Sequence, residues 1–271
     1  MKHRNYLPLW ILLVVAFALI AGISVYSPVE IFGYELKDSG LASVFSSAHD
    51  GVDDSNEALP LPAATIPDSL VDVSGERLKA APVDTAAKTI LFIGDSMLDG
   101  LYPRLAAYAR HNGHKLYAVI WYSSTSEIWG KSGRLKNYIS RLEPDYVFIC
   151  LGANELFVKD ISSKRDRYVK TLIGEIGDIP YLWIGPPNWK PDTGINTLIA
   201  ENAAPGTFFL SDGMKFERGK DGAHPTKESA AEWMDSVVRW MPAHSIHPIK
   251  LDMPTKKSDR AHRVFVHQPG E

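Results

Sequence analysis

The sequence predicts an α/β fold: a three-layer α/β/α sandwich of flavodoxin-like topology around a parallel five-stranded sheet, preceded by a transmembrane helix. Between residues 88 and 241, short runs rich in β-branched and aromatic residues alternate with segments of helical periodicity. This alternation favours a parallel sheet with helices on both faces, because right-handed crossovers leave few other arrangements. Residues 7–29 contain no Asp, Glu, Lys or Arg, which predicts the membrane helix.

The five strands are expected at residues 89–93, 116–121, 146–151, 181–184 and 207–210. Helices are expected around residues 100–111, 132–141, 165–176 and 196–203, with a last helix over 226–240. We therefore predict one catalytic domain over residues 88–241.

The amino-terminal segment is expected to be a membrane anchor over residues 1–34. A helix of residues 7–29 would be about 34 Å long, enough to cross a hydrocarbon core of about 30 Å. Lys2 and Arg4 on its short side favour a cytoplasmic amino terminus, so the rest of the chain is expected in the periplasm, tethered to the inner membrane by one span. A cleaved signal peptide is the alternative, but the apolar region is long and no clear Ala-x-Ala site follows it.

Two further segments lack a sustained period. Residues 35–87 collect Ser, Asp, Pro and Ala and are expected to be an extracytoplasmic linker, of which residues 67–73 are a candidate for docking on the domain. Residues 242–271 form a carboxyl-terminal extension containing His244, His247, His262 and His267. Their spacing matches no metal-ligand pattern, so a solvated extension or packing strap is expected rather than a metal site.

Composition excludes some functions. The net charge is −3 with both signs interspersed, so there is no basic surface of the kind that nucleic-acid binding needs. The single cysteine, Cys150, cannot form an intrachain disulfide and is expected to be a buried, inert thiol.

The residues that point to chemistry lie in two short motifs. Gly94-Asp95-Ser96 follows the first expected strand, and Asp221-Gly222-Ala223-His224 precedes the last expected helix. A serine hydroxyl becomes a good nucleophile when an imidazole takes its proton and a carboxylate orients that imidazole. Ser96, His224 and Asp221 can fill these three roles.

A third motif, Gly152-Ala153-Asn154-Glu155, follows the third expected strand, and together the three motifs resemble those of the SGNH (GDSL-type) hydrolase family. The resemblance implies that the Asn154 side chain and the Ser96 N–H bind the oxyanion. It also implies a third donor, from a glycine after the second strand, where this chain has Ser123 and Ser124 instead. The family's turn ends in Asp, and here Glu155 takes that place, a change expected to affect loop hydrogen bonding more than chemistry.

These features predict an esterase that removes a short acyl group from an envelope or extracellular carbohydrate through an acyl-enzyme on Ser96, without a cofactor or metal. Trp189 is a candidate for stacking against a sugar ring. A polysaccharide O-acetyltransferase that uses the same triad, with a separate acyl-donor membrane protein, is one alternative. A non-catalytic envelope-binding module is another. A phosphotransfer receiver is disfavoured because Gly152-Ala153-Asn154 stands where the phosphoacceptor Asp would be.

Overall fold

The computed structural model describes residues 29–31, 34–36 and 81–270. Strands β1 (Val29–Ile31) and β2 (Tyr34–Leu36) pair antiparallel as a two-stranded hairpin. They belong to a different compact unit from residues 81–270, which form the α/β domain. Of the expected anchor over residues 1–34, only residues 29–31 and 34 are described, as parts of β1 and β2. The rest of the anchor and the candidate docking segment 67–73 lie outside the described residues. Within the described ranges, no helix is both long enough and apolar enough to cross a membrane.

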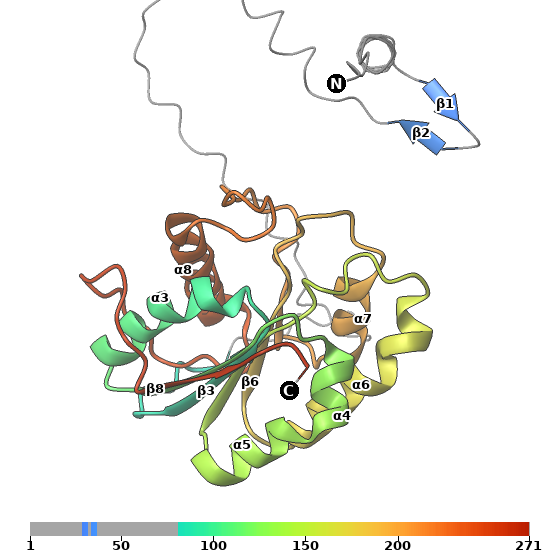
Figure 1. Ribbon diagram of the computed structural model, residues 1–271. Coiled ribbons are helices and arrows are strands. Elements are labelled where there is room, and N and C mark those ends of the chain that lie inside the picture. Colours follow the sequence, from blue (N-terminus) through green and yellow to red (C-terminus); the bar gives the residue numbers. More distant parts are fainter. Residues whose placement is uncertain (1–28, 32–33, 37–80, 271) are drawn as a thin grey trace, which may run out of the picture. The chain divides into compact units, whose positions relative to one another are not determined.

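The α/β domain is built on one sheet whose strands all run parallel (Figure 1). The strand order is β7-β6-β5-β3-β4-β8. The strands are β3 (Thr89–Gly94), β4 (Lys115–Trp121), β5 (Tyr146–Cys150), β6 (Tyr181–Ile184), β7 (Phe208–Phe209) and β8 (Arg263–His267). From β3 the chain first builds outward to β4, then returns to the other side of β3 for β5, β6 and β7. This is the flavodoxin-like order, and the reversal between β3 and β5 creates a crevice at the carboxyl edge, where ligands bind in such sheets.

The prediction of five strands is wrong by one, because β8 comes from the segment expected to be a carboxyl-terminal extension. It pairs with β4 from Tyr117↔Arg263 to Trp121↔His267. Its sequence, RVFVH, is rich in β-branched and aromatic residues that suit a sheet. The last part of the chain therefore belongs to the domain, as an edge strand of its sheet.

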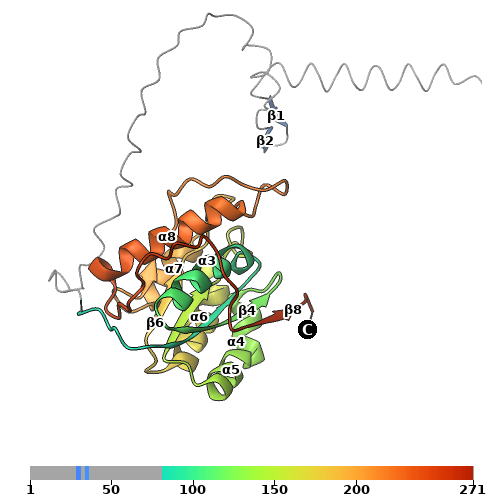
Figure 2. The ribbon, with the colours of Figure 1, turned by 90° about the vertical axis from the view of Figure 1, so that its left-hand side faces the viewer.

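Helices cover both faces of the sheet, which gives the three-layer sandwich (Figures 1 and 2). One face carries α3 (Leu98–His111) and α8 (Lys227–His244). The other carries α4 (Ser126–Ser132), α5 (Arg134–Leu142), α6 (Ile161–Ile176) and α7 (Ile195–Asn202). Helix α4 was not predicted, and it begins where the Thr125 side chain accepts the Ile128 N–H, a typical N-cap.

The central strands are buried on both faces because successive side chains enter opposite cores. In β3, Ile90 and Phe92 pack with α3 and α8, while Leu91 and Ile93 pack with the helices on the other face. This burial explains the continuous apolar runs that predicted the strands.

The end of the expected linker is part of the domain. Asp84 donates its N–H to Pro248 and accepts the Lys250 N–H, each at 2.8 Å. The chain therefore enters β3 beside the segment that follows α8, at the edge of the sheet where the strands begin.

Candidate active site

Ser96 lies in the short connection between β3 and α3, at the carboxyl edge of the sheet. The Asp95 N–H donates to the Cys150 carbonyl (3.1 Å), so this connection is tied to the end of β5. Asp95 Oδ1 then accepts the Met97 N–H (2.9 Å) and closes a tight turn around the serine. The nucleophile candidate is thus placed by backbone bonds at the reversal point of the sheet.

The Asp95 side chain itself points inward and is fully buried. Burial, reinforced by the Glu155 carboxylate, raises its pKa to about 7, although the Met97 N–H opposes the shift. Its Oδ2 makes no hydrogen bond of standard geometry within residues 81–270, as suits a carboxyl group that is partly protonated near neutral pH. Asp95 therefore shapes the turn, whereas the carboxylate hydrogen-bonded to the His224 ring is that of Asp221.

His224 sits on a tight loop directly before α8. Gly222 has a left-handed φ of +68°, which allows the chain to reverse between Asp221 and His224. Asp221 Oδ1 accepts the N–H groups of Ala223 (2.9 Å) and His224 (3.0 Å). Thr226 caps α8 by accepting the Ser229 N–H, so the loop is held between a turn and a helix start.

The structure brings the three predicted residues together in a chain of hydrogen bonds. His224 Nε2 lies 2.8 Å from Ser96 Oγ, and His224 Nδ1 lies 2.7 Å from Asp221 Oδ2. Hydrogen bonds from Ala223, and then from His224, lower the pKa of Asp221 to about 2. Asp221 is therefore an anion at neutral pH and can favour the tautomer in which Nδ1 carries the proton and Nε2 faces the serine.

Arg218 supports this loop and was not singled out in the sequence. Its guanidinium donates to the Ala223 carbonyl, and also to the carbonyls of Pro187 (3.3 Å) and Asn188 (2.9 Å). The loop that carries His224 is thereby fastened to the loop after β6. No sequence pattern marks such a residue, because its partners are backbone groups far away in the chain.

Asn154 lies in the loop after β5, beside the loop after β3. Its Nδ2 donates one hydrogen bond to the Ser124 carbonyl (2.9 Å), which leaves its second N–H for another acceptor. Gly152 begins this loop with a positive φ of +125°. The Ser96 N–H donates to no other group within residues 81–270, so it too is available to an oxyanion.

The two candidates for the third donor differ in the structure. The Ser124 N–H is used in a turn, donating to the Trp121 carbonyl (3.1 Å), and Ser124 Oγ accepts the indole N–H of Trp129 (3.0 Å). Ser123 is exposed, and its N–H donates to no other group in the described part of the domain. Ser123 also has a left-handed φ of +58°, a conformation typical of glycine. The geometry therefore favours Ser123 over Ser124.

Glu155, the residue after Asn154, holds this loop by hydrogen bonds and an ion pair. Although buried, it accepts the Ser126 N–H (2.9 Å) and hydroxyl (2.8 Å) and pairs with Arg165 (2.7 Å). It therefore fixes the loop after β5 to α4 and α6. The pKa of Glu155 is raised, mainly by burial, which the bonds from Ser126 and Arg165 oppose. None of its hydrogen bonds involves Ser96, Asp221 or His224.

Trp189 lies in the loop after β6, and its side chain contacts the loop after β5 that carries Asn154. Its indole N–H donates to the Ala153 carbonyl (2.9 Å), one residue from Asn154, and its ring is half-buried between the two cores. The exposed Phe157 packs against it edge to face, with 6.3 Å between ring centroids.

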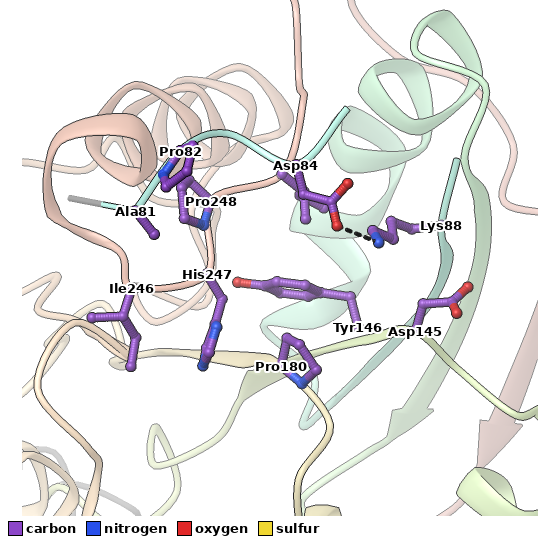
Figure 3. Close-up of a pocket in the computed structure, with 11 residues that line it drawn as sticks. Ala81, Pro82, Asp84, Lys88, Asp145, Tyr146, Pro180, Ile246, His247 and Pro248 are labelled. Carbon is purple, nitrogen blue, oxygen red and sulfur yellow. Dashed lines mark ion pairs between the residues drawn. The ribbon is translucent and has the colours of Figure 1, made fainter. Parts of the chain in front are cut away.

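A separate cavity of about 150 Å³ lies at the opposite edge, where β3, β5 and β6 begin (Figure 3). Its lining includes Tyr146, His247 and the Asp84–Lys88 ion pair of 2.5 Å. The cavity therefore lies at the edge of the sheet opposite Ser96 and takes no part in the site.

Cys150 is buried as expected. Within residues 81–270, no three His, Cys, Asp or Glu side chains are grouped to hold a metal ion.

Comparison with known proteins gives similarities at the level of solved structures. No family model and no curated protein matches the chain. One similar structure is a G-D-S-L family protein from Desulfitobacterium hafniense DCB-2, proposed to be lipolytic, with 15% identity and a TM-score of 0.42 over 56% of this chain and 98% of that one. Another is the psychrotrophic esterase EstA from Pseudoalteromonas sp., inhibited by monoethylphosphonate, with 20% identity and a TM-score of 0.39 over 56% and 98%.

The descriptions of these two proteins agree with the family resemblance of the three motifs. The functional conclusion rests on the hydrogen bonds and burial of this chain's own residues.

Proposed function

We propose that the chain is a serine ester hydrolase of the SGNH type, which removes a short acyl group from an envelope or extracellular carbohydrate. One observation carries the proposal: Ser96 Oγ, the His224 imidazole and the Asp221 carboxylate form a continuous hydrogen-bonded chain with links of 2.8 and 2.7 Å. This is the arrangement that makes a serine hydroxyl nucleophilic at neutral pH.

The reaction follows from the positions of these groups. As Ser96 Oγ attacks the ester carbonyl, its proton passes to His224 Nε2, and the Asp221 anion stabilises the resulting imidazolium. The tetrahedral oxyanion accepts hydrogen bonds from the Ser96 N–H, Asn154 Nδ2 and the Ser123 N–H. Collapse breaks the bond to the alcohol, which leaves with the proton from His224. Water, deprotonated by His224, then attacks the acyl-serine. The bond between the acyl carbon and Ser96 Oγ breaks, Oγ takes back the proton from His224, and the acid is released.

The test is covalent labelling together with turnover of a small ester. A fluorophosphonate probe should attach to Ser96 in the folded full-length chain, and p-nitrophenyl acetate should be hydrolysed. Both activities should disappear in Ser96→Ala, whose circular dichroism spectrum and melting temperature should match those of the wild type. A folded wild-type chain that takes no label would instead favour a non-catalytic binding module.

Hydrolysis and acyl transfer share the acyl-enzyme, so the second nucleophile distinguishes them. We propose water, because His224 Nε2, which lies 2.8 Å from Ser96 Oγ, can activate a water molecule at the position from which it protonates the departing alcohol. The assay is repeated with an oligosaccharide acceptor: formation of acetylated oligosaccharide in place of free acetate would identify an O-acetyltransferase that draws on a separate acyl donor.

We also propose that the domain is held at the outer face of the inner membrane by its amino-terminal segment. The uncharged residues 7–29 and the preceding Lys2 and Arg4 support this proposal. Fractionation of cells after protease treatment of spheroplasts is the test. The domain should sediment with membranes and be digested from the periplasmic side, whereas a soluble or protected domain would contradict the proposal.

A further inference from the structure

Beside the triad, an aromatic and cationic surface is unused by the catalytic steps. It consists of Phe157, Trp189 and Lys190, which we call the aromatic–lysine surface. The Lys190 ammonium lies 4.6 Å from the centroid of the Trp189 ring and 5.5 Å from that of Phe157. Phe157 is 53% exposed, one of the largest exposures of an apolar side chain in the described domain.

Hydrogen bonds join the backbone around Phe157 to the segment that follows Lys190. The carbonyls on either side of Phe157 are both bound by one residue: Leu156 O accepts the Thr193 N–H (2.8 Å), and Val158 O accepts the Thr193 hydroxyl (2.7 Å). The segment carrying Phe157 is therefore joined to the segment carrying Lys190. The Phe157 ring is therefore exposed although its backbone is held on both sides by hydrogen bonds to Thr193.

The surface is also connected to both halves of the candidate active site. On one side, the Trp189 indole is bound to the Ala153 carbonyl, next to the oxyanion donor Asn154. On the other side, the Asn188 carbonyl is bound to Arg218, which also binds the Ala223 carbonyl next to His224. Trp189 itself makes the first of these bonds and directly follows the residue that makes the second, so the surface adjoins both loops of the candidate site.

The chemistry of the three side chains indicates which kind of ligand the surface can bind. Aromatic faces are electron-rich and attract the polarised C–H face of a pyranose ring, as they attract cations. Lys190 makes no ion pair within residues 81–270, so its ammonium is available to an anion. The nearby Asp192 does not compete, because its two carboxylate oxygens accept the N–H groups of Gly194, Ile195 and Asn196.

We propose that the aromatic–lysine surface is a subsite for an acidic sugar, in which a uronate ring lies on the exposed Phe157 ring, which meets Trp189 edge to face, and its carboxylate pairs with Lys190. The proposal rests on the proposed esterase function and names its substrate class: an O-acylated, uronate-containing polysaccharide. Binding of the ring next to the ester would hold the scissile carbonyl over Ser96.

The experiment uses two chemically O-acetylated polymers as substrates, anionic polygalacturonate and neutral xylan. The acetate that the full-length protein releases from each polymer is measured. Lys190→Gln should lower the ratio of kcat/KM on polygalacturonate to that on xylan by about 3- to 5-fold, the order expected for loss of one exposed charge contact. The change should lie in KM. It should shrink in 1 M NaCl, where the Debye length is about 3 Å.

Two further variants make the result specific. Phe157→Leu keeps apolar volume but removes the ring, so it should raise KM on both polymers. Lys115→Gln removes an exposed lysine at the amino end of β4, on the opposite edge of the sheet, and should leave the ratio unchanged. Melting temperatures of all variants should match the wild type.

The outcomes separate this inference from the function on which it rests. If the wild type hydrolyses p-nitrophenyl acetate but acts on neither polymer, or if Lys190→Gln leaves the ratio unchanged, the subsite is overturned and the esterase stands. If the wild type neither hydrolyses p-nitrophenyl acetate nor takes the fluorophosphonate, the esterase itself fails.

Discussion

Gly94 links the sheet to the nucleophile, and replacing it with alanine tests how Ser96 is positioned. It pairs with Cys150 across β3 and β5, and it is the residue before Asp95. A Cβ atom added at Gly94 would lie against the Cys150 carbonyl oxygen, well inside the 3.0 Å that real Cβ atoms respect, and 3.2 Å from Leu98 Cβ. Neither neighbour is a flexible side-chain end, so the backbone itself must move by several tenths of an ångström.

Two costs follow from this movement. Overpacking a close-packed interior typically costs about 1–3 kcal/mol. The same Cys150 carbonyl accepts the Asp95 N–H, and weakening that buried bond adds about 1 kcal/mol. We therefore expect Gly94→Ala to lower the free energy of unfolding by about 2–4 kcal/mol.

The movement also displaces Ser96 from the loop that carries Asn154, since both loops start at this strand pair. Misplacement of reacting groups by about 1 Å can reduce the rate about 100-fold, so we expect kcat to fall about 10- to 100-fold. The assays are guanidinium denaturation and turnover of p-nitrophenyl acetate well below the melting temperature of the variant.

Gly174→Ala is the matched control. Gly174 lies in α6 and has no positive φ, and a Cβ atom added there would meet no other atom within 4 Å. Alanine should therefore stabilise the chain by up to about 1 kcal/mol and leave kcat unchanged. If the free energy of unfolding of Gly94→Ala lies within about 0.5 kcal/mol of the wild-type value and its kcat is unchanged, the proposed role of the β3–β5 contact is refuted.

Three further predictions concern the site. His224→Ala should remove nearly all turnover without changing the melting temperature, and retention of a tenth of kcat would contradict its role as base. Asn154→Ala should lower kcat about 100- to 1,000-fold with little change in KM, as expected for one oxyanion donor, and a raised KM alone would assign it to substrate binding. The raised pKa of Asp95, about 7, means that its contribution to stability is complete below about pH 4 and is lost as the pH rises through 7. Asp95→Asn should therefore be the more stable form at pH 8, by up to about 4 kcal/mol, and a parallel pH dependence of unfolding in both proteins would contradict the shift.

The hydrogen-bonded set of Ser96, His224 and Asp221 could be predicted from sequence because its members lie in two short, local motifs. Asp221 and His224 are three residues apart, so one turn brings the carboxylate to Nδ1 whatever the rest of the chain does. Their approach to Ser96 is different, since it requires the fold, and the prediction depended on the strands being parallel. The loop of Asp221 and His224 follows β7 and precedes α8, so its approach to Ser96 depends on the order of the strands from β3 to β7.

Elements whose signal is weak or non-local were missed. The β8 run lies in a tail rich in His and Pro, so its composition concealed five residues that suit a strand. Helix α4 is only seven residues long and contains Gly130, which lowers helix propensity, and its main signal is the Thr125 cap. Arg218 acts only through backbone carbonyls, which every residue type supplies, so no residue pattern could reveal its partners.

Ser123 shows why sequence alone could not choose between the two candidates for the third oxyanion donor. A glycine would mark a left-handed position, whereas serine reaches φ of +58° only at a cost of about 1–2 kcal/mol. The surrounding structure can hold that conformation because the loop is bound on both sides of Ser123. The Tyr122 N–H donates to the His267 carbonyl in β8 (3.1 Å), and the Ser124 carbonyl accepts the Asn154 amide (2.9 Å). The donor loop therefore depends on the carboxyl-terminal strand that sequence analysis placed outside the domain.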